Sequence, residues 1–298
     1  MRNQNNISNI TMFATLFSPL VIKELAKFGY SKKFSRILDY FIQKKYQLST
    51  DEKLASFYDS IYEILKKEYP NEYIYKNAIA KNILLGIHSL NTSFMINELR
   101  TKNSKVDVVI INGTLTAYEI KSKYDNLNRL QKQLQDYKTV FEKIYVITDE
   151  KYSQNLLHLQ KDGIGILVLN KKGSISTLVK ASSQMDNINL SNLFDILRKD
   201  EYLAIIKKIS KIDIDVPNSQ VYRYAKEVFV TLDKKKVYKE TAKVLKQRGD
   251  SVMLKEFITK VPNSLKARAI ETKLTKKEKS NFLSLLEVET KEIIARGL

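Results

Sequence analysis

Apolar positions along the chain follow helical spacing at both ends and strand-like spacing in the middle. Residues 8–70 read as helical, and a longer helix is expected at 72–85, where apolar side chains recur every three to four residues. After residue 184 no strand-like run remains, and helices are expected at 192–209, 218–232 and 234–246. The pattern predicts helical regions on both sides of a central segment.

The central segment holds runs of the length and β-branched content typical of strands. Strands are expected at 94–99, 106–111, 115–121, 144–148 and 164–169, with a weaker candidate at 174–178. An apolar stripe between the third and fourth runs indicates a helix that Asp125 caps, and residues 150–161 also read as helical. A hairpin, a crossover helix and a further strand predict an α/β fold, with a mixed β-sheet core flanked by helices and with helical N- and C-terminal regions.

Boundary signals divide this pattern further. Ser31 and either Ser49 or Thr50 are expected to cap helices, Ser49 with Glu52 as a capping box, while Pro217 and Pro262 mark helix starts. We expect a helical N-terminal region at 1–70, a core at 71–182 and a helical C-terminal region at 183–298.

Composition narrows the function classes. The 298 residues carry 51 Lys and Arg against 33 Asp and Glu, a formal charge of +18, which favours a polyanionic partner such as nucleic acid. AT-rich coding is the competing explanation for the lysines. Because cysteine is absent, disulfides and thiolate metal sites are excluded, and no Gly-rich phosphate loop is present.

The apolar stretch Met12 to Ile22 is interrupted by Ser18 and Pro19 and is too short to span a bilayer. It is interpreted as a helical element that packs on its neighbours. We expect a cytoplasmic protein without a membrane partner.

Two apolar strands carry charged residues, Asp107 on the first and Glu119 and Lys121 on the second. Burying an unpaired charge is costly, so a solvated strand edge competes with a site that binds a cation. If Asn112 and Gly113 formed a two-residue turn, the carboxylates would face apart. A three-residue loop with Gly113 left-handed sets Asp107 opposite Glu119, where one cation could bridge them.

Oxygen ligands of this kind suit Mg²⁺ or Mn²⁺. A nearby lysine ammonium can orient the attacking water or stabilise the transition state, so Asp107, Glu119 and Lys121 predict metal-assisted hydrolysis of a phosphodiester. The bare acidic-x-Lys spacing is weak evidence, because it recurs at Asp51, Asp149, Asp233, Glu271 and Glu289. Lysine clusters on the C-terminal helices read either as solvated faces or as phosphate contacts.

The array of Glu98, Asp107 and Glu119-Ile120-Lys121, followed by a helix with Gln133 and Tyr137, resembles the PD-(D/E)XK nuclease superfamily. Within it, the chain is similar to a bacterial group of stand-alone, mostly uncharacterised members. The similarity extends over residues 16–18, 25–31, 72–92, 118–122, 125–133, 194–198 and 216–218. Val106 replaces the proline of the motif, which is common among divergent members and leaves the carboxylate geometry possible.

The resemblance implies a restriction-endonuclease-like, four-stranded mixed sheet and assigns roles to particular residues. Asp107 and Glu119 are implied metal ligands, the Ile120 carbonyl is a third, and Lys121 is the catalytic lysine. Glu98 resembles an additional upstream ligand, with a salt-bridged strand-end glutamate near Arg100 as the alternative.

Arg129, Gln133 and Tyr137 recur every four residues along one flank of the expected helix and resemble residues that contact DNA in the RecB-like branch. Tyr137 also fits the apolar core stripe. Lys123 and Arg100 complete the expected nucleic-acid contacts. His88 is expected to cap or pack a helix end.

The leading function is a Mg²⁺- or Mn²⁺-dependent nuclease acting on DNA, in phage defence, repair or a mobile element. A non-cleaving or partner-activated nucleic-acid-binding module is the alternative. A helical interaction protein with a small sheet is a third, and RNA as a substrate, a homo-oligomer and a protein partner stay open.

Overall fold

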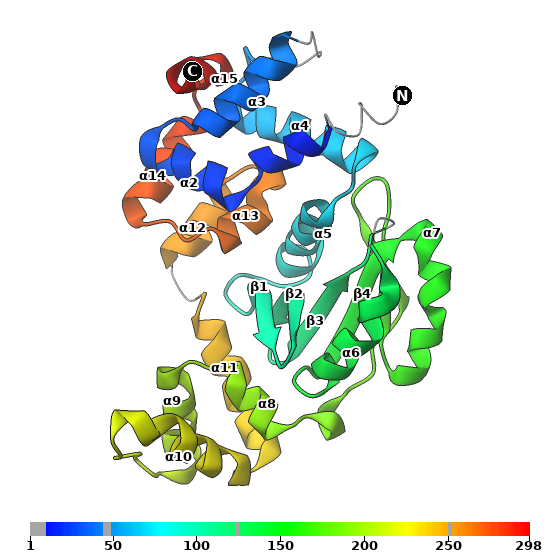
Figure 1. Cartoon of the computed structure of the whole chain (residues 1–298), viewed down its shortest axis with the longest axis vertical. Helices are drawn as coiled ribbons and strands as arrows, with labels where there is room; N and C mark the ends of the chain where they lie inside the picture. Colours follow the sequence, from blue (N-terminus) through cyan, green and yellow to red (C-terminus); the bar gives the residue numbers. More distant parts are fainter. Residues whose placement is uncertain (1–9, 44–48, 123–124, 250–251) are drawn as a thin grey trace. The chain divides into compact units, whose positions relative to one another are not determined.

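The computed structural model describes residues 10–43, 49–122, 125–249 and 252–298. The chain divides into two compact units, unit 1 with Met1–Ile83, Lys171–Gly173 and Ser251–Leu298, and unit 2 with Leu84–Asn170 and Ser174–Asp250. The predicted α/β class is confirmed, because a mixed sheet is flanked by helices and both ends of the chain are helical (Figure 1). The predicted boundaries at 70 and 182 stay a prediction.

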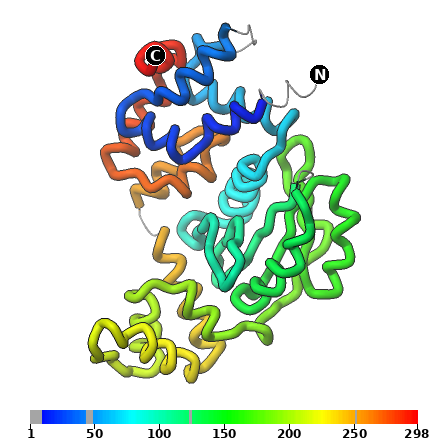
Figure 2. The backbone as a smooth tube through the Cα atoms, viewed as in Figure 1, coloured from blue at the N-terminus to red at the C-terminus, as the bar shows by residue number. Residues whose placement is uncertain are grey.

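Unit 1 is built of helices from both ends of the sequence. They are a helix at 10–16, α2 (Pro19–Phe28), α3 (Lys32–Gln43), α4 (Leu54–Glu68), α5 (Glu72–Ile79) with the π-helix η1 (Ala80–Leu85), α12 (Val252–Lys260), η5 (Asn263–Leu265), α13 (Lys266–Glu271), α14 (Lys276–Leu285) and α15 (Thr290–Gly297). Helix α2 packs on α14 and α3 on α15, so that the blue and red segments lie side by side in Figure 2. The apolar N-terminal stretch is thus a helical element of this unit, as predicted.

Aromatic side chains fill the centre of unit 1. Phe13 stacks on Phe41 at 4.1 Å between ring centroids, and Phe17 contacts the rings of Tyr58 and Tyr73 at 5.2 and 4.9 Å. All of these side chains are buried. Their burial removes a large apolar area from water and stabilises the packing of the helices.

Two helix starts in unit 1 test the capping predictions. The cap at Ser31 is confirmed, because its hydroxyl accepts the N–H of Phe34 at 3.3 Å. The cap at Ser49 or Thr50 is wrong, because α4 begins only at Leu54. The residues before α4 and the first residue of α4 are instead held by the C-terminal segment, since Thr290 N donates to Glu52 O at 3.0 Å and Leu54 N donates to Val288 O at 2.9 Å. Long-range backbone pairing therefore overrides a local capping signal.

Unit 2 contains a six-stranded sheet in the order β1 (Phe94–Thr101), β2 (Ser104–Ile111), β3 (Leu115–Ile120), β4 (Lys143–Asp149), β5 (Gly165–Leu169) and β6 (Ile175–Val179). The pairs β1–β2, β2–β3 and β5–β6 are antiparallel, while β3–β4 and β4–β5 are parallel. All six predicted strands are present. The sheet is two strands wider than the four that the resemblance implies.

The helices of unit 2 follow the strands. They are η2 (Leu127–Arg129), α6 (Leu130–Lys138), α7 (Glu150–Ser153), η3 (Gln154–Asp162), η4 (Met185–Asn187), α8 (Leu190–Asp195), α9 (Lys199–Ser210), α10 (Asn218–Thr231) and α11 (Lys234–Gln247). Helix α6 packs on β2 and β4, and α7 packs on β4 and β5 (Figure 1). The hydrophobic core lies between the sheet and these helices. Helix α6 is the crossover helix that the sequence predicted.

Two predictions about unit 2 are wrong in detail. The helix expected at 192–209 is broken into α8 and α9, because the Arg198 N–H donates to the Glu201 carboxylate at 2.7 Å and starts a new helix. Asp125 does not cap the crossover helix, since its carboxylate accepts the backbone N–H of Ser122 at 2.8 Å. Asn126 makes the cap instead.

Pro217 and Pro262 directly precede the first residues of α10 and η5, as predicted. Across the described residues, no helix is both long and apolar enough to cross a bilayer.

Candidate active site on strands β2 and β3

The hairpin between β2 and β3 has the register that the charged residues require. Ile111 pairs with Leu115 across a three-residue loop, in which Gly113 has φ 69°. Continuing from the pair Val108 and Tyr118, this register sets Asp107 opposite Glu119. The predicted three-residue loop with a left-handed glycine is therefore confirmed.

Glu119 is nearly inaccessible, with 1% of its surface exposed, and both of its oxygens are engaged. Its Oε1 lies 2.8 Å from Lys121 Nζ, and its Oε2 accepts the hydroxyl of Tyr137 at 2.7 Å. A buried carboxylate is tolerated because an opposite charge and a hydrogen bond offset its desolvation.

Lys121 lies between strand β3 and helix α6. Its ammonium also donates to Gln133 Oε1 at 3.1 Å, and its backbone N–H donates to Ile147 O at 2.9 Å. Gln133 and Tyr137 are one turn apart on α6, so the spacing expected from the sequence aims both at the same pair of charges.

Asp107 is half-buried and contacts the second strand through its backbone. Its Oδ2 accepts the Ile120 N–H at 2.8 Å. The strand that carries Glu119 and Lys121 is thereby fixed to the Asp107 carboxylate. The Ile120 carbonyl as a metal ligand stays a prediction.

Tyr137 is both a core residue and a site residue. Its side chain is fully buried, and its hydroxyl lies 2.9 Å from Lys105 O as well as near Glu119. Burial, followed by the Glu119 charge, raises the pKa of Tyr137 far above its usual value, so the phenol is neutral at every physiological pH.

Three polar residues that the sequence did not single out also belong to this region. Ser104 Oγ donates to Asp136 Oδ2 at 2.6 Å and fastens β2 to α6. Thr148 on β4 is fully buried, and its hydroxyl has no hydrogen-bond partner among the described residues. A serine, an aspartate and a threonine in amphipathic elements have no sequence signal that separates them from surface residues.

Glu98 is exposed and forms an ion pair with Lys105 at 2.7 Å. It lies in β1 at the position opposite Asp107, between the pairs Asn97–Val108 and Leu99–Val106, and has φ 57°. A left-handed conformation is costly for a glutamate and marks a strained point beside the site. In the part of the chain that the structure describes, no three or more His, Cys, Asp or Glu side chains gather into a metal-binding group. Glu98 as a ligand stays a prediction.

The remaining predicted contacts lie around this centre. Arg100 on β1 and Arg129 at the start of α6 are exposed, and Lys123 lies outside the described residues. His88 is 2.8 Å from the Asn112 amide of the hairpin loop. It contacts the turn rather than a helix end.

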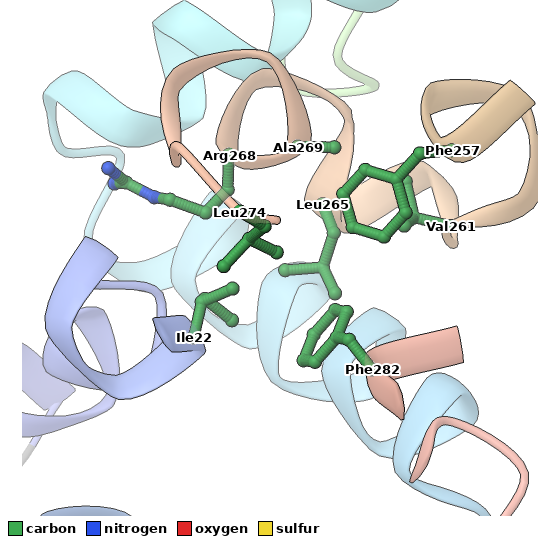
Figure 3. A pocket seen from close by; sticks show the side chains of 8 residues that line it. All are labelled: Ile22, Phe257, Val261, Leu265, Arg268, Ala269, Leu274 and Phe282. Atoms are coloured by element: carbon green, nitrogen blue, oxygen red, sulfur yellow. The ribbon is translucent and has the colours of Figure 1, made fainter. Parts of the chain in front are cut away.

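A separate small pocket in unit 1 has a different character. It is lined by Ile22, Phe257, Val261, Leu265, Arg268, Ala269, Leu274 and Phe282, and Figure 3 shows apolar side chains around it. Because no carboxylate, histidine or hydroxyl lines it, this pocket offers no catalytic chemistry. The polar cluster on β2 and β3 is the stronger candidate site.

The donor set of that cluster fits a hard cation. Asp107 and Glu119 offer only oxygen, which Mg²⁺ and Mn²⁺ prefer, and Mg²⁺ is commonly held by one or two carboxylates with water as the remaining ligands. Two carboxylates on one sheet face are therefore sufficient as the protein part of such a site.

The fold and this cluster define an α/β protein with a paired-carboxylate and lysine centre on a mixed sheet. The chain belongs to the bacteriophage P4 protein cII family, whose model matches residues 65–292. Protein cII of Enterobacteria phage P4 is 32% identical over 87 residues, which are 28% of this chain and 33% of that protein. The match thus spans about a third of the length of this curated relative.

A solved structure with similarity is that of a protein of unknown function from Silicibacter pomeroyi. It is 12% identical and covers 52% of this chain and 80% of its own, with a TM-score of 0.29. A likeness this low supports no structural argument.

Proposed function

We propose that the chain is a Mg²⁺- or Mn²⁺-dependent nuclease that hydrolyses phosphodiester bonds of nucleic acid, with DNA as the first substrate to test. The observation that supports it is the convergence of Asp107, Glu119 and Lys121 on one sheet face, where Glu119 and Lys121 are 2.8 Å apart. The proposal assigns the chain to the PD-(D/E)XK class, with the mixed sheet as a restriction-endonuclease-like core.

Each residue has a part in this proposal that follows from its chemistry. Asp107 and Glu119 would hold the cation, which lowers the pKa of a bound water and offsets charge on the scissile phosphate. Lys121 would orient the attacking water or stabilise the transition state with its ammonium. Gln133 and Tyr137 keep Lys121 and Glu119 in place through hydrogen bonds of 3.1 and 2.7 Å.

Binding of nucleic acid is proposed from charge. Helix α11 carries six lysines and one glutamate, and Lys235, Lys236, Lys239 and Lys243 are exposed on it. Tyr238 anchors this helix to the sheet, since its hydroxyl accepts the N–H of Leu115 at 3.0 Å. Leu115 begins the strand that ends with the candidate site, so α11 is anchored to the same strand and offers a basic surface for phosphates in the same unit.

The biological setting is proposed from the similarity to protein cII of Enterobacteria phage P4. That protein comes from a phage, which favours a mobile element over the other settings considered, phage defence and repair. A cytoplasmic location follows from a DNA substrate.

The test is an incubation of the purified chain with circular, linear and single-stranded DNA, with and without Mg²⁺ or Mn²⁺. Glu119→Gln is the inactive variant. Glu289→Gln is its matched control, because Glu289 and Lys291 form the same acidic-x-Lys pair at 2.9 Å in unit 1, where their side chains are 45% and 54% exposed. Cleavage by the parent and the control, and not by Glu119→Gln, supports the proposal. Equal cleavage by all three locates the activity elsewhere.

A second candidate function is a binding module that does not cleave or needs a partner for activity. It is favoured by the state of Glu119, whose two oxygens are both occupied within the chain. Retained DNA binding by a parent that cleaves no substrate with either metal would support this alternative.

A further inference from the structure

The Lys121 ammonium is the counter-ion of Glu119, one of the two carboxylates of the candidate site. Its side chain is 11% exposed and contacts Glu119 Oε1 at 2.8 Å and Gln133 Oε1 at 3.1 Å. A cation that is held by Glu119 must therefore share this carboxylate with Lys121 or displace it. Two cations at one oxygen repel each other strongly in a site with little water.

A second acceptor for Lys121 lies next to it on the sheet. The parallel pairs Glu119–Val146 and Ile120–Ile147 continue to Lys121 beside Thr148, and strand alternation points both side chains to the same face. The Thr148 hydroxyl is buried and lacks a hydrogen-bond partner among the described residues. Buried hydroxyls are nearly always paired, so such an orphan needs an explanation.

We infer that Lys121 is an internal counter-cation that a divalent metal displaces from Glu119, and that Thr148 and Gln133 then hold its ammonium. This inference rests on the proposed metal site. Lys121 would thus neutralise the Glu119 carboxylate in the absence of metal, and the same lysine would move toward its position for chemistry when metal binds. Thr148 is a positioning residue in this scheme, because it acts through Lys121.

The test measures Mn²⁺ binding directly, by calorimetry and by electron paramagnetic resonance of the free ion. Lys121→Met should bind Mn²⁺ about tenfold more tightly than the parent, because a competing charge is gone. Thr148→Val should bind several-fold more weakly, because the displaced ammonium loses an acceptor, while Thr148→Ser keeps the hydroxyl and should match the parent.

Lys138→Met is the matched control. It removes one positive charge from α6, where Lys138 pairs with Asp162 at 2.9 Å, and should leave the Mn²⁺ affinity within about twofold. Thermal unfolding establishes that each variant is folded. Lys121→Gln replaces Lys121→Met if the latter does not fold.

The outcomes distinguish a failure of the displacement of Lys121 from a failure of the proposed metal site. Equal Mn²⁺ affinity in the parent and in both Lys121 variants would overturn the displacement by metal, with the metal site intact. A Thr148→Val affinity equal to the parent would overturn the role of Thr148. Absence of Mn²⁺ binding at millimolar concentration in the parent and every variant would overturn the proposed function itself.

Discussion

Lys266 in unit 1 and Lys121 in unit 2 are both buried, and these two lysines differ in what surrounds them. Lys266 in unit 1 is 8% exposed, and its ammonium donates to the carbonyls of Ile258, Thr259 and Val261 at 2.7, 3.0 and 2.8 Å. Lys121 in unit 2 is 9% exposed and contacts a carboxylate and an amide oxygen. Lys266 thus donates hydrogen bonds to carbonyls at the end of a helix, whereas Lys121 pairs with the charge of Glu119.

This difference indicates which buried lysine suits chemistry. Backbone carbonyls at the end of α12 stay in place, so Lys266 has a fixed structural role. Burial lowers the pKa of Lys266 and outweighs the opposing effect of the Asp59 charge. In the proposed scheme Glu119 exchanges Lys121 for a divalent cation, because a carboxylate binds either. Burial of a lysine alone therefore says little about function, whereas its partners say more.

The largest expected effect is loss of cleavage on changing the carboxylates of unit 2. Asp107→Asn and Glu119→Gln should each lower the rate by about a thousandfold or more, because a metal ligand charge is lost. DNA binding should change little, since most phosphate contacts remain. A nuclease assay with a binding assay at matched protein concentration measures both. Cleavage at the parental rate by either variant would place the active site elsewhere.

The next effect separates Lys121 from the carboxylates. Lys121→Ala should lower the rate by about a hundredfold to a thousandfold, the usual result of losing one transition-state contact, while Mn²⁺ still binds. Lys291→Ala is the control in unit 1 and should cleave as the parent does. If Lys121→Ala lost both metal binding and cleavage, Lys121 would be part of the folded structure of the site rather than of its chemistry.

Stability should distinguish the two buried lysines. Lys266→Met leaves three carbonyls without their donor and should lower the free energy of unfolding by about 2–3 kcal/mol. Lys121→Met leaves Glu119 without its counter-ion and should cost about as much. Added Mn²⁺ should restore the stability of Lys121→Met and not of Lys266→Met, because the proposed metal replaces the counter-ion lost in the first variant, whereas the three carbonyls of unit 1 still lack their donor. Thermal unfolding with and without Mn²⁺ is the measurement, and equal recovery of both would contradict it.

The strands of unit 2 could be predicted because their side chains alternate and their turns carry clear residues. The three-residue loop followed from Gly113 and from the cost of separating Asp107 and Glu119. Gln133 and Tyr137 followed from their spacing on one helix, which is independent of the rest of the fold. Periodicity and local turn geometry are thus enough to assemble the centre of the site.

The parts that were missed depend on contacts far apart in the sequence. The start of α4 is set by Val288, more than two hundred residues away, and no local pattern records that pairing. The break between α8 and α9 depends on Glu201, which Arg248, the residue that follows α11, holds at 2.6 Å. Thr148 is a strand residue of ordinary type, and only the register across β3 and β4 places it beside Lys121.

A smaller expected effect is the loss of folding stability at acid pH. Burial acts to raise the pKa of Glu201, but hydrogen bonds from Arg248 and from the Arg198 N–H outweigh it, and the pKa is lowered overall. A carboxyl with a depressed folded-state pKa adds stability above its unfolded pKa of about 4.3, and this stability is lost as the pH falls through the folded value. We therefore expect acid-dependent stability that Glu201→Gln lacks. Urea unfolding at pH 7 and pH 3 measures it, and equal acid dependence in parent and variant would contradict it.

The smallest effect asks which unit binds nucleic acid. Replacing Lys235, Lys236 and Lys239 of α11 by alanine should weaken DNA binding and reduce its salt dependence by up to about three released counter-ions, because each phosphate contact contributes nearly one.

The matched control replaces Lys273, Lys276 and Lys277 of unit 1, which are equally exposed and remove the same charge. DNA-binding constants are measured from low to moderate salt. The constant of the α11 variant should be lower than that of the parent, and the constant of the control should stay near that of the parent. The reverse result would assign the polyanion surface to unit 1, and unit 2 would then keep the buried charges of the candidate site without the surface that brings DNA to it. If the binding constants of all three proteins did not change with salt concentration, the formal charge of +18 would reflect amino-acid composition and not a polyanion-binding surface.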